Sequence, residues 1–392
     1  MNSLVLIFSA IALDAIGIGL VFPILPRLLH AIAPGSDTAL SIGIVAALYS
    51  LAQFLFAPVL GALSDRFGRR PILLLSLAGA TLSYLCMAFA NSFWLLLVGR
   101  AIAGLTSANL AVATAYITDV SSEAERPGRF GLLNALFGVG FIIGPVLGGA
   151  LGDHSLRAPF LAAALLNALN LLFALFVLPE SRAPSRSPFD LVTLSPLTAM
   201  RWALSTKSLR RVTALFFLFA TAGEVYGTCW ALWGSESFRW SGLWIGLSLG
   251  AFGVCQALAQ ALLPGRAVRL MGERRTVLAG IACACLALVA LAFATQAWMV
   301  FAIMPVIALS GIGTPALQAM ATRQVGAQEQ GQLQGVLSAV MSLAAVIGPL
   351  VFATIYGAVH AHWPGAIWLS VIAVYAALVP IVLGLDGESR QR

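Results

Sequence analysis

The amino-acid sequence predicts an all-α membrane protein with twelve transmembrane helices in two six-helix halves. Of its 392 residues, 60% are hydrophobic and only 9% are charged. Soluble domains carry about 25% charged residues, so this chain could not cover its surface in water. Its apolar runs are about 20 residues long, which suits helices, because membrane-spanning strands need only about 10 residues of alternating polarity.

Charged residues, prolines and Asn/Gly clusters divide the chain into twelve apolar spans. The predicted spans cover approximately residues 4–29, 40–62, 71–90, 93–118, 128–152, 157–178, 209–233, 242–264, 275–295, 298–321, 331–357 and 364–384. The one long interruption, residues 179–208, is rich in Pro, Ser and Arg and has the composition of a linker. The sequence therefore predicts an N-terminal half (1–178), a cytoplasmic linker (179–208) and a C-terminal half (209–392).

Basic residues are distributed unevenly between the two sides of the predicted membrane. With a cytoplasmic N-terminus, the inner loops and the C-terminus hold 18 of the 22 Lys and Arg residues. The outer loops hold only Arg27, Arg157 and Arg239. This bias is the positive-inside signal, and it predicts a multi-pass membrane protein with both termini in the cytoplasm. It also accounts for the net charge of +7, so we expect no nucleic-acid partner.

The two halves repeat at a fixed offset along the chain. The same offset relates Gly61 to Gly265, Gly68 to Gly272, Gly131 to Gly335 and Gly144-Pro145 to Gly348-Pro349. Parallel repetition of two six-span halves is a layout of secondary transporters, in which the substrate binds between the halves near the midplane of the bilayer.

Two motifs point to a transporter family. Residues 61–71, Gly-Ala-Leu-Ser-Asp-Arg-Phe-Gly-Arg-Arg-Pro, resemble the signature loop between the second and third helices of the major facilitator superfamily. Residues 131–149 resemble the antiporter motif of the fifth helix, which marks drug/proton exchangers in that superfamily. The residues that match the antiporter motif include Gly140, Gly144, Pro145, Gly148 and Gly149.

Over nearly the whole chain, the sequence is most similar to the tetracycline/proton antiporters of that superfamily. Matching segments include Leu13-Asp14-Ala15, Leu48-Tyr49, Gly99-Arg100, Ala158-Pro159-Phe160 and Pro315-Ala316-Leu317-Gln318. The resemblance implies a major facilitator fold and export of a drug-like molecule, tetracycline or another antibiotic, in exchange for protons by alternating access. It also implies no cofactor, with a metal ion entering only as part of a chelated substrate. We expect a monomer surrounded by membrane lipid.

The chain departs from the tetracycline exporters at four positions. Ser83 stands where that group has an acidic residue, Gln256 where it has a histidine, and Cys283 where it has an aspartate. In return, Glu224 stands in the seventh helix where the group usually has a glutamine. The predicted site for the proton therefore differs from that of the group.

Ionisable residues inside apolar spans are candidates for proton coupling, since each costs about 2.5–3.5 kcal/mol at membrane depth. Three qualify: Asp14, Arg100 and Glu224. Asp14 and Glu224 lie near the middles of counterpart spans, and two carboxylates in one cavity could exchange protons near neutral pH. In the alternative interpretation, Asp14 only ties helices together and Arg100 extends to the lipid headgroups.

The signature loop supplies the candidate gate. The predicted gating residues are Asp65, Arg66, Arg69, Arg70 and Asp119, which lie at cytoplasmic helix ends. We expect them to form a latch that breaks when the cavity opens inward, and control of topology is the alternative. The counterpart segment 265–275 lacks an acid at the position of Asp65, so we expect it to be mainly a basic anchor.

Amide and aromatic residues of the central spans are the candidate substrate contacts, because buried amides need partners and a wet cavity supplies them. These candidates are Gln53, Asn109, Asn134, Phe137, Tyr226, Trp230, Trp233, Gln256, Gln260 and Gln318. Each aromatic residue has the alternative of facing lipid or packing. No hydrolase triad, zinc-ligand spacing or P-loop occurs, so we expect no enzyme. An exporter of a metabolite or sugar, and a non-transporting receptor or scaffold, are the alternative functions.

Overall fold

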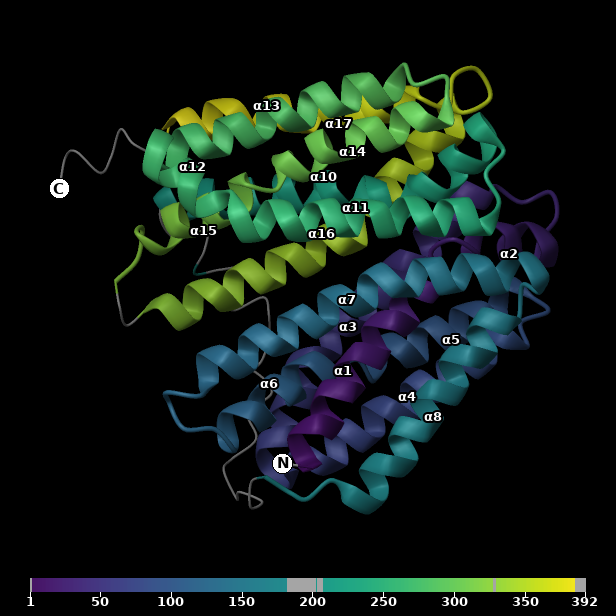
Figure 1. Ribbon diagram of the computed structural model, residues 1–392, viewed down its shortest axis with the longest axis vertical. Helices are drawn as coiled ribbons and strands as arrows, with labels where there is room; N and C mark the ends of the chain where they lie inside the picture. The colour runs from purple at the N-terminus through teal and green to yellow at the C-terminus, as the bar shows by residue number, and fades with distance from the viewer. Residues whose placement is uncertain (1, 182–201, 203–206, 327–328, 385–392) are drawn as a thin grey trace. The chain divides into compact units, whose positions relative to one another are not determined.

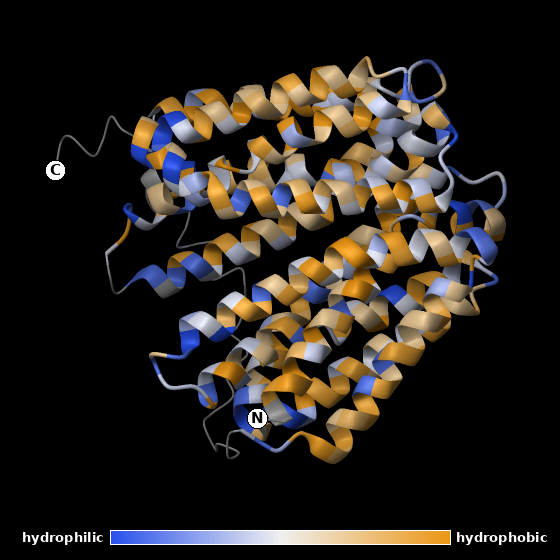
Figure 2. Cartoon of the chain, in the orientation of Figure 1, coloured by the Kyte–Doolittle hydropathy of each residue, from blue (hydrophilic) through white to orange (hydrophobic). Residues whose placement is uncertain are grey.

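The computed structural model describes residues 2–181, 202, 207–326 and 329–384, and within these ranges it contains helices and no strand (Figure 1). Twelve helical segments are long and apolar enough to cross a membrane, which confirms the predicted all-α membrane fold. Apolar residues run along these helices, whereas hydrophilic residues gather at helix ends and connections (Figure 2).

Sixteen helices build the described part of the chain. They are α1 (Asn2–Val21), α2 (Leu25–Ile32), α3 (Thr38–Phe67), α4 (Arg69–Ala88), α5 (Phe93–Leu105), α6 (Asn109–Asp119), α7 (Arg126–His154), α8 (Ala158–Val177), α10 (Lys207–Phe238), α11 (Gly242–Leu262), α12 (Pro264–Met271), α13 (Glu273–Ala292), α14 (Ala297–Ser310), α15 (Gly313–Thr322), α16 (Gln330–Val359) and α17 (Ala366–Gly384).

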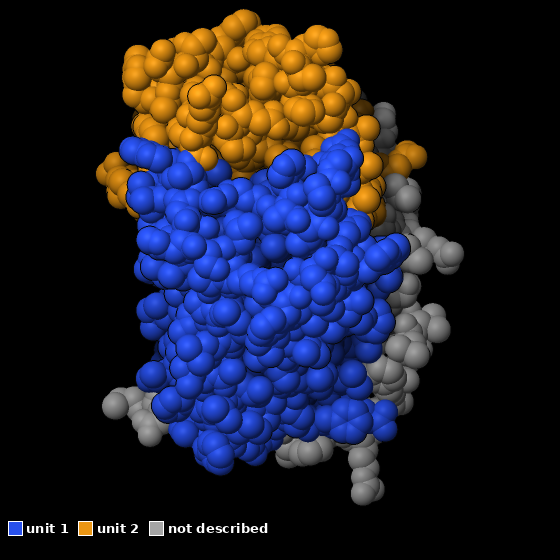
Figure 3. Space-filling model, turned by 90° about the vertical axis from the view of Figure 1, so that its right-hand side faces the viewer, with its two compact units in different colours: residues 1–38, 45–195, 241–250 blue, residues 39–44, 196–240, 251–392 orange. Residues whose placement is uncertain are grey.

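The chain forms two compact units, coloured separately in Figure 3. Unit 1 comprises residues 1–38, 45–195 and 241–250, and unit 2 comprises residues 39–44, 196–240 and 251–392. The start of α3 thus belongs to unit 2, and the start of α11 belongs to unit 1. The predicted half boundaries at residues 178 and 209 remain a prediction, since most of the predicted linker lies outside the described residues.

The internal repeat is visible in the helix bounds. Four helices of the first half, α4 to α7, begin at positions that the repeat relates to the first residues of α13 to α16 respectively. Gly68 and Gly272 precede α4 and α13 with φ angles of +101° and +80°. Both adopt a backbone conformation that glycine reaches without steric cost, which explains why the repeat retains a glycine here.

Three spans that the sequence predicts as continuous are each divided into two helices. The first is interrupted between α1 and α2 next to Pro23 and Pro26, which cannot donate helical hydrogen bonds. The fourth is interrupted between α5 and α6, and the tenth between α14 and α15. Irregular backbone at membrane depth is tolerated where it is buried in protein or lines a water-filled cavity.

The core of unit 1 forms where α1, α4 and α6 meet. Its fully buried residues include Ile11, Leu73, Leu77 and Ile117. Tyr116 joins this cluster with 1% of its surface exposed, and its hydroxyl donates to the Pro179 carbonyl at 3.1 Å. This packing holds α1 and α6 together, and these two helices carry the first candidate site.

Candidate transport site

Asp14 of α1 meets the first residue of α6. Asn109 Nδ2 donates a hydrogen bond of 3.1 Å to Asp14 Oδ1. Asn109 is buried, and Asp14 is half-buried. Within the described residues, the buried Oδ1 atom of Asn109 has no hydrogen-bond partner. An acceptor atom is thus left open beside the carboxylate, as expected where water or a ligand completes the contacts.

Arg100 of α5 lies in the same cluster without an ion pair to Asp14 in the described part of the chain. Its guanidinium carbon lies 5.7 Å from the centre of the Tyr49 ring, a cation–π distance. Its Nε atom is buried and has no hydrogen-bond partner among the described residues. Tyr84 interacts electrostatically with both Asp14 and Arg100. Two tyrosines therefore share the surroundings of the carboxylate and the arginine.

The interruption of the fourth span contributes Ser107 to this cluster. Gln53 Nε2 donates to Ser107 Oγ at 2.9 Å, and the Tyr49 hydroxyl lies 3.1 Å from the same oxygen. Ser107 was not among the predicted site residues, because residues 93–118 were predicted to form one continuous helix. The structure thus brings Asp14, Arg100 and the predicted contacts Gln53 and Asn109 into one polar site in unit 1.

The interruption of the tenth span has a similar arrangement in unit 2. Pro315 has no N–H group with which to bond the carbonyl of Gly311, four residues earlier. Gln260 Nε2 donates to that carbonyl at 2.9 Å. The Gln256 amide also packs against Gly311, where an added Cβ would collide with its nitrogen. Discontinuous helices supply substrate and ion sites in secondary transporters, so both predicted glutamines lie in a suitable position.

Glu224 is half-buried on α10 of unit 2. Among the described residues, its carboxylate makes no hydrogen bond or ion pair. A Cβ added to Gly348 of α16 would lie 2.7 Å from the Cβ of Glu224, so the repeated Gly-Pro pair leaves room for this side chain. Glu224 and Asp14 belong to different units, and their predicted sharing of one cavity stays a prediction.

The predicted aromatic contacts of the seventh span are mostly packed in unit 2. Trp230 and Trp233 are 3% and 1% exposed, and their rings lie 5.7 and 5.1 Å from Trp368 of α17. Tyr226 is half-buried, and its ring is 5.6 Å from that of Trp368. The burial of Trp230 and Trp233 favours the packing alternative for these two, whereas Tyr226 remains a candidate contact.

The other predicted contacts are more accessible. Asn134 and Gln318 are exposed. Phe137 is half-buried and stacks on Phe141 with ring centres 6.2 Å apart. A role in substrate binding stays a prediction for these three residues.

The antiporter motif presents two glycine faces on α7. Gly140, Gly144 and Gly148 are spaced by four residues and pack against α1. A Cβ atom added to Gly140 or Gly144 would lie only 2.7 or 2.6 Å from a backbone carbonyl oxygen of α1. A Cβ atom added to Gly148 would collide with the Leu20 carbonyl. Gly149 lies on the start of α11, where an added Cβ would collide with the carbonyl oxygen of Gly242. Close approach of backbones is the reason small residues line helix contacts in membranes.

Asp153, near the end of α7, extends the contact with α11 and was missed by the sequence analysis. Its Oδ1 accepts from the Gly242 N–H at 2.8 Å, and its Oδ2 accepts from the Leu243 N–H at 3.0 Å. Arg27 donates to the same carboxylate at 2.6 Å. A carboxylate at a helix N-terminus is stabilised by the free N–H groups there.

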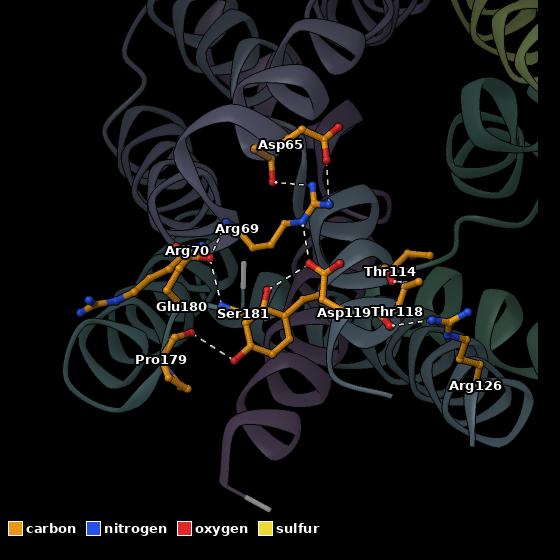
Figure 4. A network of polar contacts seen from close by, with 12 residues as sticks. Asp65, Arg69, Arg70, Thr114, Thr118, Asp119, Arg126, Pro179, Glu180 and Ser181 are labelled. Carbon is orange, nitrogen blue, oxygen red and sulfur yellow. Dashed lines mark hydrogen bonds and ion pairs between the residues drawn. The ribbon is translucent and has the colours of Figure 1, made fainter. Parts of the chain in front are cut away.

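The signature loop forms a charge network within unit 1 (Figure 4). Arg69 is 6% exposed, and its guanidinium lies 2.7 Å from Asp65 Oδ1 and 3.0 Å from Asp119 Oδ2. Arg70 donates to the Leu175 carbonyl at 2.6 Å, and Arg66 lies over the Phe67 ring. The predicted residues Asp65, Arg69 and Asp119 thus meet, while Arg66 and Arg70 point elsewhere. Their action as a gate stays a prediction.

Glu180 completes this network and was also missed. Its Oε1 accepts from the Arg69 N–H at 2.7 Å, and its Oε2 accepts from the Arg70 N–H at 3.2 Å (Figure 4). A Cβ on Gly68 would collide with this carboxylate. Glycine is therefore required here for two reasons: its positive φ angle and the space that Glu180 occupies. An acidic residue directly after a long apolar run, in Pro179-Glu180-Ser181, is the signal that could have revealed it.

The counterpart segment in unit 2 contains an ion pair that the expectation of a mainly basic anchor did not include. Glu273 and Arg323 form an ion pair of 2.8 Å. In the repeat they stand at the positions of Arg69 and Asp119 respectively, so the pair recurs with its charges exchanged. The counterpart of Asp65 is Arg269, so the acid is missing at that position, as predicted. The acidic residue of this segment is instead Glu273, four residues later.

The described residues offer no metal centre. No group of three or more His, Cys, Asp or Glu in this part of the chain could hold a metal ion.

Comparison with known proteins identifies the family. The family model described as Major Facilitator Superfamily matches residues 7–233 and 212–391. The chain belongs to this superfamily. This major facilitator protein is 48% identical to the tetracycline resistance protein of class C from Escherichia coli, covering 97% of this chain and 96% of that protein. It is 41% identical to the class G protein from Vibrio anguillarum, covering 97% of each.

A solved structure agrees on the fold. The nucleoside transporter NupG superposes with a TM-score of 0.80 at 14% sequence identity, covering 99% of this chain and 100% of that one. The family and these relatives confirm the resemblance drawn from the motifs, and they make the protein a multi-pass membrane transporter rather than an enzyme.

Proposed function

We propose that this major facilitator protein exports a tetracycline-type drug from the cytoplasm in exchange for protons. Support comes from the related tetracycline resistance proteins, which match nearly the full length of the chain. The antiporter motif is compatible with exchange, because its glycines lie on α1 and α11 at backbone distance. In this proposal the protein acts as a monomer in the bacterial inner membrane, with both termini in the cytoplasm.

The polar site of unit 1 carries the proposal. Asp14 is held by Asn109 rather than paired with Arg100, so its carboxylate is open to a proton or to a cationic group of the drug. Arg100 keeps its charge at any workable pH, so switching falls to the carboxylate. In unit 2, the Glu224 carboxylate has no hydrogen-bond partner among the described residues and offers a second such group.

The transport cycle follows from competition for these carboxylates. A proton arriving from outside neutralises a carboxylate, weakens the attraction for the drug and releases it. Loss of that proton to the cytoplasm restores the charge and the affinity. A gradient then drives export without a nucleotide or a resident metal, and a metal ion enters only if the drug carries it as a chelate.

The Arg69 network is proposed to act as the cytoplasmic latch of this cycle. Its ion pairs join the ends of α3, α4 and α6, and opening toward the cytoplasm would break at least one of them. Exposure of Asp65 leaves its pair with Arg69 screened by water, so this is the weaker of the two contacts.

Proton release by the detergent-purified protein on addition of tetracycline tests the proposal. The wild type should release protons, whereas Asp14→Asn and Glu224→Gln should release fewer or none. In cells, expression should raise the tolerated drug concentration, and an uncoupler should abolish that effect. Absence of resistance and of proton release across a broad antibiotic panel would favour the alternative, an exporter of a metabolite or sugar.

A further inference from the structure

Three polar side chains gather where α10 and α16 end in unit 2. Glu236 lies in the last turn of α10, Tyr356 in the last turn of α16, and His360 directly after α16. The Tyr356 hydroxyl donates to Glu236 Oε2 at 2.8 Å, and His360 Nδ1 lies 3.1 Å from the same oxygen. We name these residues the end cluster. None of them takes part in the site described above.

The end cluster contains both solvent-exposed side chains and a side chain buried between the helices. Tyr356 is 1% exposed, whereas the side chains of Glu236 and His360 are 34% and 41% exposed. The His360 ring stacks on the Tyr356 ring with centres 5.4 Å apart. An imidazole at the surface therefore shares one carboxylate oxygen with a buried hydroxyl. Histidine is the side chain whose ordinary pKa lets it gain and lose a proton at physiological pH.

Few other titratable groups face the end cluster. Within the described residues, Tyr356 interacts electrostatically with Glu236 and with Cys229 of α10. Arg239 and His362 follow closely in the adjoining connections, and α17, which also packs on α10, contains no Asp, Glu, Lys, Arg or His. Glu236 and His360 are thus the two proton-binding groups that contact each other at this end, with His362 close by in the sequence.

The same helix interface leads to Glu224. Gly348, Phe352, Tyr356 and His360 follow one another at intervals of four residues, so each lies next to the following one along α16 and its C-terminal end. Gly348 packs on Glu224, and the Phe352 carbonyl lies 3.7 Å from the Cys229 sulfur. Glu224 and Glu236 are twelve residues apart on α10, or about 18 Å along its axis. The two carboxylates therefore lie on one packed helix pair, α10 and α16.

We propose that Glu236 and His360 bind the incoming proton at the outer surface, before it reaches Glu224. This inference rests on the proposed function, because it requires proton exchange and cytoplasmic termini, which put the end of α10 outside. A hydronium ion gives its proton to the His360 imidazole and leaves as water. The imidazolium passes that proton to Glu236 and returns to the neutral form. Glu224 is the next carboxylate inward along α10, and in this proposal it is the group that finally receives the proton from Glu236.

Two variants separate proton binding from a structural tie between α10 and α16. Glu236→Gln keeps an oxygen that accepts from Tyr356 and keeps the side-chain size, but its amide cannot hold the transported proton. Tyr356→Phe removes the tie and leaves the carboxylate and the imidazole in place. A purely structural cluster would tolerate the first substitution and suffer from the second.

The experiment measures tetracycline uptake into everted membrane vesicles, whose lumen corresponds to the outside, as the luminal pH is lowered. For Glu236→Gln and His360→Asn, we expect half-maximal uptake to require at least about tenfold more protons than in the wild type. Tyr356→Phe should keep the wild-type pH profile with a lower melting temperature. A wild-type profile for Glu236→Gln, or a shifted profile confined to Tyr356→Phe, would overturn the inference.

Failure of the proposed function has a different signature. Wild-type vesicles would then take up no tetracycline, or take it up independently of luminal pH. Glu224→Gln serves as the reference for lost coupling, since its uptake should not respond to luminal pH at all. A shifted but still pH-dependent uptake in Glu236→Gln is the result specific to the end cluster.

Discussion

Asn109 donates its side-chain amide to the Asp14 carboxylate at 3.1 Å, which links the first residue of α6 to the middle of α1. Because α6 starts directly after the interruption of the fourth span, the carboxylate is tied to a helix end that borders irregular backbone. The Arg100 guanidinium instead lies above the face of the Tyr49 ring. This arrangement lets the carboxylate change its charge without first breaking an ion pair.

The first prediction concerns this carboxylate. Asp14→Asn retains an oxygen for the Asn109 amide but removes the charge, so we expect tetracycline-induced proton release to fall while the melting temperature stays near that of the wild type. Asn109→Ala retains the charge and loses one hydrogen bond, worth about 0.5–1.5 kcal/mol. Proton release measured in lightly buffered solution distinguishes the two. Full proton release by Asp14→Asn would assign coupling to another group.

The second prediction concerns the two glycine faces of α7. Gly149→Ala places a methyl group against the Gly242 carbonyl, and overpacking of this kind costs about 1–3 kcal/mol. Gly138→Ala is the matched control on the same helix, because nothing lies within 4 Å of an added Cβ there. The control should be neutral or stabilising by about 0.5–1 kcal/mol. Thermal unfolding of the purified variants checks both, and equal melting temperatures would contradict the close contact.

The third prediction uses the ion pair of unit 2. Arg323→Glu sets two carboxylates against each other where a 2.8 Å pair stood, and the double exchange Glu273→Arg with Arg323→Glu restores opposite charges. Arg323 is 74% exposed, so we expect an effect of at most about 1 kcal/mol that weakens with salt. A double-mutant cycle of melting temperatures at low salt measures it. The idea fails if the double variant melts no higher than Arg323→Glu.

The fourth prediction concerns Glu180 as the cap of α4. Glu180→Ala removes the acceptor of the Arg69 and Arg70 N–H groups, and loss of a helix cap costs about 0.5–2 kcal/mol. Glu123→Ala, an exposed carboxylate in the connection before α7, is the control and should change little. Both stability and drug export should be measured. Equal stability of the two variants would show that the cap is dispensable.

The sequence predicted the features that depend on local composition. Apolar length and clustered charges predicted the twelve spans, and the fixed offset between the halves predicted the equivalence of Gly68 and Gly272, which the structure confirms in their positive φ angles. Asp65, Arg69 and Asp119 were predicted together as charged residues at helix ends, and in the structure they are in contact.

Features that depend on packing over long sequence distances were not accessible in the same way. Glu180 accepts a hydrogen bond from an N–H group 111 residues earlier, so the acidic residue after the apolar run marks Glu180 itself but not its partner. Trp230 and Trp233 lie in a short apolar stretch of α10, so the sequence alone could not tell whether their rings face a cavity or the core. The role of Ser107 was not predicted, because the interruption between α5 and α6 that contains it has no proline to mark it in the sequence.

The exchanged charges of the two ion pairs also bear on how a chain with two similar halves assembles. Equivalent helices of such a chain can dock in each other's place during folding. Docking of α4 beside the end of α15 would bring Arg69 to Arg323, and docking of α13 beside the end of α6 would bring Glu273 to Asp119. Both mistaken pairs repel, whereas both native pairs attract, so each half can distinguish its own helices from those of the other half.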